Sequence, residues 1–164
     1  MDTELHFSTG DDEHDTPLSF FAPIAKAVDG FDIDPAASST SDLADVNYTK
    51  EDDGLSQDWT GNVWLNPPYS DVSEWLDRVD TEMNTERLDD SGPDLLVSLV
   101  FARTSTRWFH NYATTADLLC FVKGRLKFGD AENSAPAPSL VAVWGDYPDA
   151  LVEHLETVGF VVEP

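Results

Sequence analysis

Apolar residues in this chain recur in short segments whose spacing alternates between that of helices and that of strands. Behind Thr16 and Pro17, an apolar stripe predicts a helix that ends at Gly30. The stripe consists of Phe20, Phe21, Ile24 and Val28. Residues 31–34 alternate apolar and acidic side chains and run into Pro35, which predicts a short strand followed by a loop.

A second strand is predicted at residues 62–65, where the apolar run stops at Asn66-Pro67-Pro68-Tyr69. Two successive prolines cannot donate the hydrogen bonds of a sheet, so the chain must leave the sheet there. Apolar residues at helical spacing then predict a helix from Asp71 to about Arg87. The nearly continuous apolar run at 95–101 is typical of a strand covered on both faces, as in parallel sheets.

The second half of the chain continues this alternation. Its predicted elements are strands at 118–128 and 140–144, a helix at 149–158 and an apolar end at 160–162. Successive strand, loop and helix units favour one α/β domain with a doubly wound, mostly parallel sheet, spanning residues 16–164 behind an acidic, flexible leader at 1–15. Such sheets bind ligands beyond the carboxyl ends of their strands, where the loops at Pro35 and Asn66 lie.

The balance of charge is strongly acidic. The 164 residues include 32 Asp and Glu against 9 Lys and Arg, which gives a net charge of −23. A globally basic nucleic-acid-binding protein is therefore excluded. Because so many carboxylates destabilise a compact chain unless salt screens them, one hypothesis is a salt-rich cytoplasm. The other hypothesis is that the acidic surface imitates DNA and occupies a DNA-binding partner.

Several kinds of site are not expected. Cys120 is the only cysteine, so no internal disulfide can form, and its apolar neighbours predict a buried thiol. The four histidines are widely spaced and no histidine–cysteine pair has ligand spacing, so we expect no metal. The chain has neither a signal-peptide pattern nor a run of about 18 apolar residues, so we expect a cytoplasmic protein with no membrane partner.

The tetrapeptide Asn66-Pro67-Pro68-Tyr69 carries the sharpest candidate chemistry. The exocyclic amine of a nucleobase is a weak nucleophile because its lone pair is delocalised into the ring. The side-chain oxygen of Asn66 and the backbone carbonyl of Pro67 can each accept one amine hydrogen, which leaves the lone pair free to attack a methyl sulfonium. The prolines hold both acceptors rigidly, and Tyr69 offers a face for stacking an extruded base. A purely structural turn is the alternative interpretation.

Six sequence blocks occur in order along the chain. They lie at residues 16–17, 31–37, 52–59, 66–69, 106–110 and 124–128. Together they resemble the phage-type DNA N6-adenine methyltransferases, a small Dam-like group within the S-adenosylmethionine-dependent enzymes. The resemblance covers most of residues 16–145, and it implies a compact Rossmann-like domain with S-adenosylmethionine as cofactor and DNA as partner.

The resemblance implies a cofactor site in the loop after the first strand. Asp34 is placed to bind the ammonium group of the methionine moiety. Asp58 would bind the amino group of the cofactor's adenine with Trp59 beside the ring, while Asp53 competes for that role. A Gly-x-Gly loop is absent, so the pocket has to be built from alanine and serine. The implied cofactor-binding residues are Thr16, Pro17, Asp34, Pro35, Ala36, Asp53, Asp58 and Trp59.

Positive charge is concentrated in one part of the chain. Residues 101–129 contain five of the nine basic residues and a single acid, Asp117. This concentration indicates a phosphate-facing surface, with Trp108 as nearby stacking area. Ion pairs with neighbouring carboxylates are the alternative interpretation. The predicted nucleic-acid-binding residues are Arg103, Arg107, Trp108, Lys123, Arg125 and Lys127.

The leading hypothesis is therefore a DNA adenine N6-methyltransferase that uses S-adenosylmethionine, from a halophilic archaeon or its virus. Its predicted catalytic residues are Asn66, Pro67, Pro68 and Tyr69. Methylation of another amine or amide, on a protein or an RNA, is the alternative among enzymes. A non-enzymatic acidic DNA mimic is the alternative from another class.

Overall fold

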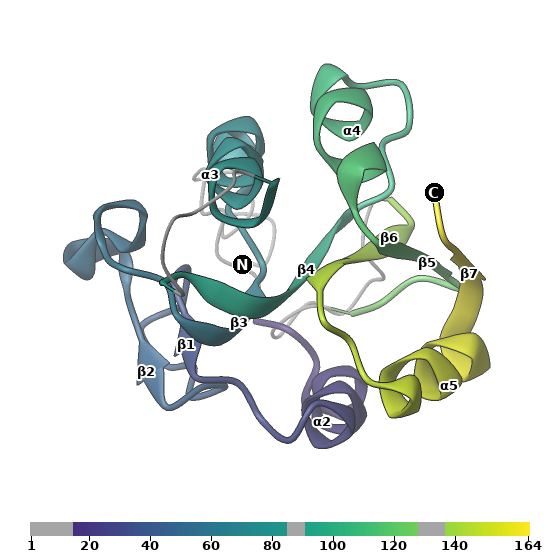
Figure 1. Ribbon diagram of the computed structural model, residues 1–164, viewed down its shortest axis with the longest axis horizontal. Coiled ribbons are helices and arrows are strands. Elements are labelled where there is room, and N and C mark those ends of the chain that lie inside the picture. The colour runs from purple at the N-terminus through teal and green to yellow at the C-terminus, as the bar shows by residue number, and fades with distance from the viewer. Residues whose placement is uncertain (1–14, 85–90, 128–136) are drawn as a thin grey trace, which may run out of the picture.

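The computed structural model describes residues 15–84, 91–127 and 137–164. The predicted leader lies outside the described residues except for Asp15, and so does Phe128 at the end of a predicted strand. Seven strands form one sheet in the order β2-β1-β3-β4-β6-β5-β7 (Figure 1). The strands are β1 (Ile33–Asp34), β2 (Val46–Asn47), β3 (Gly61–Leu65), β4 (Pro93–Phe101), β5 (Leu118–Val122), β6 (Ser139–Gly145) and β7 (Gly159–Val162).

Five of the seven strands point in the same direction. β1 pairs parallel with β2 and β3, and β3 pairs parallel with β4. β6 lies antiparallel between β4 and β5, so β5 points the same way as β4, while β7 runs antiparallel to β5. The structure therefore confirms an α/β fold on a single, mostly parallel sheet, and it adds two antiparallel strands.

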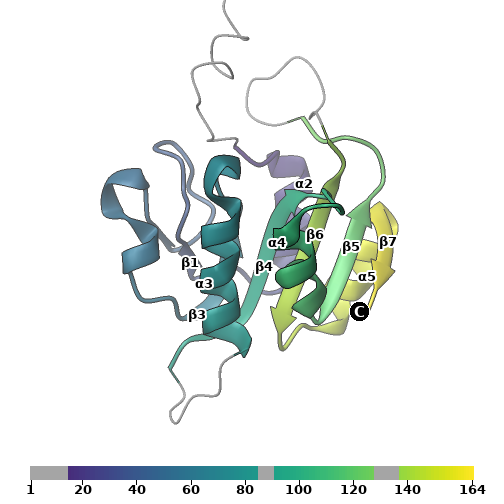
Figure 2. The same cartoon turned by 90° about the horizontal axis from the view of Figure 1, so that it is seen from above.

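Helices cover both faces of the sheet (Figures 1 and 2). They are α2 (Leu18–Ala27), α3 (Val72–Asn84), α4 (Arg107–Asn111) and α5 (Asp149–Val158). α3 and α4 lie over one face, and α2 and α5 lie over the other. Alternate residues of β4 enter the two cores, Val97 and Leu99 on the α2 side and Leu96 and Val100 on the α3 side. A strand buried on both faces has apolar residues at successive positions, which explains the continuous run in the sequence.

The predicted helix behind Pro17 forms as α2 and continues through Pro23, because burial of its apolar stripe against the sheet offsets the hydrogen bond that proline cannot donate. Two strands differ from their predicted form. β5 ends at Val122, where a turn at Gly124 with a φ of 76° takes the chain out of the sheet. β2 was not predicted, because a two-residue strand leaves no periodicity in the sequence.

The sheet brings several loops to one edge. The loops after β1, β3, β4 and β5 all leave at the carboxyl edge, since these strands run in the same direction. The N-terminus of α2 reaches the same edge, because Nδ2 of Asn66 donates a hydrogen bond to Oγ1 of Thr16 over 3.1 Å. Segments far apart in the sequence are therefore neighbours at this edge.

Candidate active site at the carboxyl edge of the sheet

A cavity of about 490 Å³ opens beyond the ends of β1 and β3. This volume lies within the range of about 300–1,000 Å³ that is usual for small-molecule sites. Of the predicted site residues, the cavity is lined by Thr16, Asp34, Pro35, Ala36, Asp53, Asn66 and Pro68. The wall does not include Pro17, Asp58, Trp59, Pro67 or Tyr69.

The wall of the cavity is acidic. Its carboxylates belong to Asp15, Asp34, Glu51, Asp53 and Asp71. Lys50 is the one basic residue among those that line the cavity in the described part of the chain. A wall of this charge favours a ligand with a net positive charge and repels phosphate esters.

Asp34, at the end of β1, is the buried carboxyl group of this wall. Only 3% of its surface is exposed, and its Oδ1 accepts a hydrogen bond from the backbone N–H of Ala36 at 3.2 Å. Burial raises the pKa of Asp34 to about 7, although the hydrogen bond from Ala36 opposes this shift. A cationic group bound beside this carboxyl would favour its ionised form.

Asn66 lines the cavity directly beyond β3. Its amide nitrogen is held by the hydroxyl group of Thr16, so the nitrogen faces α2 and the amide oxygen lies on the opposite side of the amide group. Pro67 is buried, and the rings of Pro67 and Pro68 fix φ at both positions, so the backbone that follows Asn66 is restrained. The amide of Asn66 and the backbone carbonyls of the tetrapeptide therefore belong to a rigid segment.

Tyr69 joins this tetrapeptide to the loop after β4. Its ring stacks on Phe101 with the ring centroids 4.0 Å apart and the planes at 13°. The guanidinium carbon of Arg103 lies 5.4 Å from the centre of the Phe101 ring. Burial raises the pKa of the Tyr69 hydroxyl, and the charge of Arg103 opposes the shift. Since Phe101 covers one face of the Tyr69 ring, a stacked base has to use the other face.

The residues predicted for the cofactor's adenine lie in different places. Asp53 lines the cavity, between two short 3₁₀ turns. Asp58 is exposed and does not reach the wall. Trp59 is buried behind the wall, where its Nε1 donates to the carbonyl of Gly54 at 2.9 Å.

The five basic residues predicted to bind nucleic acid follow strands that end at the carboxyl edge of the sheet. Those after β4 are Arg103 and Arg107, those after β5 are Lys123, Arg125 and Lys127, and all five are exposed. Trp108 is only 8% exposed and packs in the core beneath α3 and α4, so its ring offers little area to a ligand. Phe128 and Gly129, the end of the predicted basic segment, lie outside the described residues.

Most of the chain matches the model of a known protein family. Residues 5–149 match the model described as DNA N-6-adenine-methyltransferase (Dam). The chain belongs to this family. Membership supports DNA N6-adenine methylation as the activity, and enzymes of this kind generally take the methyl group from S-adenosylmethionine. No curated protein and no solved structure matches the chain.

The family match does not test every prediction. A halophilic or viral origin stays a prediction, because the match does not bear on it.

The structure itself bears on membrane spans and metal sites. Within residues 15–84, 91–127 and 137–164, no helix is both long and apolar enough to cross a membrane. The same residues contain no group of three or more side chains that could hold a metal ion.

Sequence reasoning missed part of the wall. Trp75 lines the cavity although its helical spacing indicates only a core residue. Gly54 also lines it, and a side chain at this position would collide with the carbonyl oxygen of Pro35. Glycine inside the block at 52–59 is a signal for such a close approach, whereas nothing in the sequence distinguishes Trp75 from the other apolar residues of its helix.

Proposed function

We propose that this enzyme transfers the methyl group of S-adenosylmethionine to the N6 amine of adenine in DNA, with the cofactor in the acidic cavity. One observation carries the proposal: Asp34, the last residue of β1, and Asn66, which follows the adjacent parallel strand β3, line the same cavity. A carboxyl group suited to a cation and an amide suited to an amine therefore border one volume.

The chemistry of the wall fits S-adenosylmethionine, whose ammonium and sulfonium groups outweigh its carboxylate. In our assignment, Asp34 accepts hydrogen bonds from the ammonium group, and the small residues Pro35 and Ala36 allow the cofactor to approach the backbone. Asp53 is favoured over Asp58 for the adenine amino group, because only Asp53 lines the cavity. Trp59 supports this wall from behind rather than stacking on the cofactor.

The tetrapeptide provides the acceptors for the substrate. Oδ1 of Asn66 and the carbonyl oxygen of Pro67 each accept one hydrogen of the adenine amine, so its lone pair becomes available. S-adenosylmethionine supplies an electrophilic methyl group. As the new bond from the amine nitrogen to the methyl carbon forms, the bond from that carbon to sulfur breaks and an uncharged thioether is the leaving group. Positive charge therefore develops on the amine, and the two fixed oxygens stabilise it. The extra proton then passes to water, so no catalytic base is required.

Thr16 orients Asn66 in this mechanism. We expect Thr16→Ala to lower kcat about five- to tenfold, because the Asn66 amide loses the hydrogen bond that fixes its direction. Thr16→Ser keeps the hydroxyl group and should remain near the wild-type kcat. Steady-state kinetics at saturating S-adenosylmethionine makes the comparison, and an unchanged kcat in Thr16→Ala would contradict this role.

The exposed cations at the carboxyl edge bind the DNA backbone in our proposal. Arg107→Ala and Lys123→Ala should each weaken DNA binding a few-fold and lower the slope of log affinity against log salt by about one. Lys26→Ala is the matched control, since Lys26 is exposed in the last turn of α2, at the opposite edge. Gel shifts over a series of KCl concentrations measure both quantities. Equal slopes in all three variants would indicate that these cations serve only as local ion pairs.

A methylation assay tests the function itself. Unmethylated DNA is incubated with labelled S-adenosylmethionine at KCl concentrations up to the molar range, and the nucleosides are analysed by mass spectrometry. We expect N6-methyldeoxyadenosine, formed best at high salt if the acidic surface is an adaptation to a salt-rich cytoplasm. Label found only on protein or RNA would support the alternative amine or amide methyltransferase. Absence of both transfer and cofactor binding would support the DNA mimic.

A further inference from the structure

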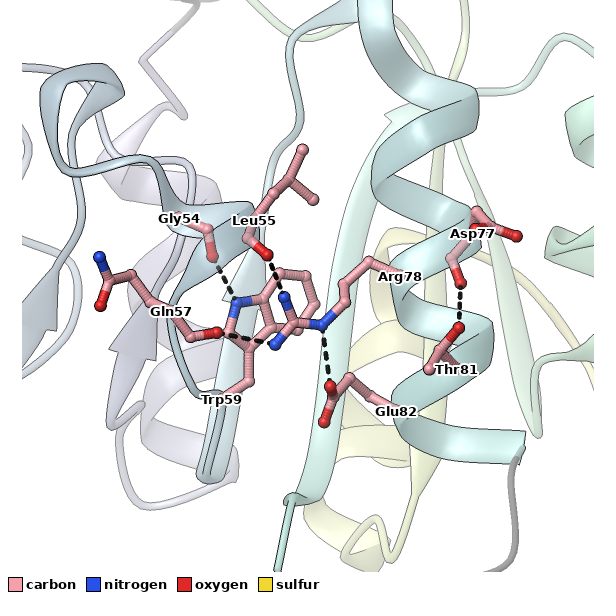
Figure 3. A network of polar contacts seen from close by, with 8 residues as sticks. All are labelled: Gly54, Leu55, Gln57, Trp59, Asp77, Arg78, Thr81 and Glu82. Carbon is pink, nitrogen blue, oxygen red and sulfur yellow. Dashed lines mark hydrogen bonds and ion pairs between the residues drawn. The ribbon is translucent and has the colours of Figure 1, made fainter.

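Helix α3 carries a side chain that holds one wall of the cavity from outside. Arg78 is not among the residues that line the cavity, yet its guanidinium group donates to the carbonyl oxygens of Leu55 and Gln57 (Figure 3). The distance from Nη2 to the Gln57 oxygen is 2.7 Å. Its Nε is paired with Glu82, one turn further along the helix, at 2.8 Å. The fork of the guanidinium group is thus aimed at the segment between β2 and β3.

The same guanidinium group covers Trp59. Its central carbon lies 4.4 Å from the centre of the indole ring. The Trp59 ring also stacks with Trp75 of α3, with the ring centroids 6.2 Å apart. Because Nε1 of Trp59 donates to the Gly54 carbonyl, the backbone of this wall is tied to α3 both directly by Arg78 and through Trp59.

This wall has little regular structure of its own. It consists of two 3₁₀ turns, η1 (Lys50–Asp52) and η2 (Gly54–Ser56), which meet at Asp53. Asp53 has a φ of 53°, in the left-handed region that non-glycine residues rarely adopt. Since 3₁₀ turns also have poor hydrogen-bond geometry, contacts from outside add to the hydrogen bonds that the segment makes within itself.

We propose that Arg78 is a positioning residue that fixes Asp53, Gly54 and Leu55 at the cavity and thereby sets the affinity for the adenosine half of S-adenosylmethionine. This inference rests on the proposed function, in which Asp53 meets the cofactor's adenine. Arginine suits the task because its planar fork donates to two carbonyls at once while lying over an aromatic ring. Lysine keeps the charge but lacks the planar fork that donates to both carbonyls while it covers the ring.

Two cofactor analogues test which half of the cofactor depends on Arg78. S-adenosylhomocysteine contains both halves, 5′-methylthioadenosine lacks the amino-acid half, and neither carries a sulfonium charge. Arg78→Met should raise the Kd of both analogues by a similar factor, about ten- to thirtyfold, and Arg78→Lys should raise both by less. Asp34→Asn should raise only the Kd of S-adenosylhomocysteine.

The control is Thr81→Ala on the same helix. Its exposed hydroxyl donates to the carbonyl of Asp77 and contacts no part of the wall (Figure 3), so both Kd values should stay at the wild-type level. In turnover, Arg78→Lys should raise KM for S-adenosylmethionine while kcat and the Kd for DNA change less than about threefold. A general loss of folding would instead affect all three quantities.

Each outcome decides a different question. If Arg78→Lys has the wild-type Tm and binds both analogues as the wild type does, the role of Arg78 is refuted, even if Arg78→Met fails to fold. A loss confined to S-adenosylhomocysteine also refutes it, because the effect would then lie at the amino-acid half. If the wild-type protein binds neither analogue, the proposed function itself is wrong.

Discussion

Asn66→Ala should nearly abolish methyl transfer to adenine while it leaves S-adenosylmethionine bound with almost the wild-type Kd. In the proposed mechanism the variant loses one of the two oxygens that stabilise the developing charge on the amine, and removal of such a preorganised group costs about 10²–10³-fold in kcat. The cofactor keeps Asp34 and the wall around Asp53, so its affinity should change less than about threefold. Single-turnover kinetics measures transfer, and calorimetry measures cofactor binding.

Two further variants sharpen this result. Asn66→Asp retains an oxygen acceptor and should keep measurable turnover, well above that of Asn66→Ala. Asn84→Ala is the matched control, because Asn84 is an exposed residue at the far end of α3. In the part of the chain that the structure describes, its side chain donates hydrogen bonds only to Asp80 and Thr115. Turnover near the wild-type level in Asn66→Ala would refute the mechanism.

Asp34→Asn should weaken S-adenosylmethionine binding about 10- to 100-fold at a pH of about 8, because a charge-assisted hydrogen bond to the ammonium group is lost. In the wild type the carboxyl must be ionised to make this bond, and burial raises its pKa to about 7. Wild-type affinity should therefore be level above pH 7 and fall up to about tenfold for each pH unit below it. Calorimetry on both sides of pH 7 measures this profile, which should be nearly flat in Asp34→Asn.

The same carboxyl group has the opposite effect on the stability of the ligand-free protein. Its pKa in the folded state, about 7, exceeds its ordinary value of 3.8, so the unfolded chain releases the proton first as the pH rises. The stability that Asp34 contributes is thus fully present below pH 3.8 and is lost as the pH rises through about 7. Asp34→Asn should therefore have a higher Tm than the wild type at a pH of about 8. A lower Tm would show that the ionised carboxyl is already stabilised without a ligand.

Site residues that lie at the end of a predicted strand could be identified from the sequence. Asp34 ends the short alternating segment that forms β1, and Asn66 comes directly after β3. Parallel strands bring residues at their carboxyl ends to one edge of the sheet. Asp53 and Asp58 could not be separated in the same way. Both precede β3 in an irregular segment, and tertiary contacts of that segment, such as the packing of Gly54 against Pro35, bring Asp53 and not Asp58 to the cavity.

Trp108 shows what the sequence could not predict about the basic segment, namely which of its side chains are buried. In the sequence it stands among cations and suggests stacking area, but its side chain faces the core beneath α3 and α4. The helix that carries it is only five residues long, so no periodicity marks which side is buried. The concentration of cations around it could be identified from composition alone, because the charge of a side chain does not depend on how its neighbours pack.

The sequence by itself determined most of the local elements, the α/β class and the residue types at the strand ends, because periodicity, proline positions and charge are properties of short segments. Only the tertiary structure decided that β6 enters the sheet antiparallel between β4 and β5, that Thr16 holds Asn66, and that Arg78 holds the wall at Leu55. Each of these depends on contacts between residues separated by many positions in the chain. Such contacts form only when the whole sheet and its two cores pack together, so no local pattern records them.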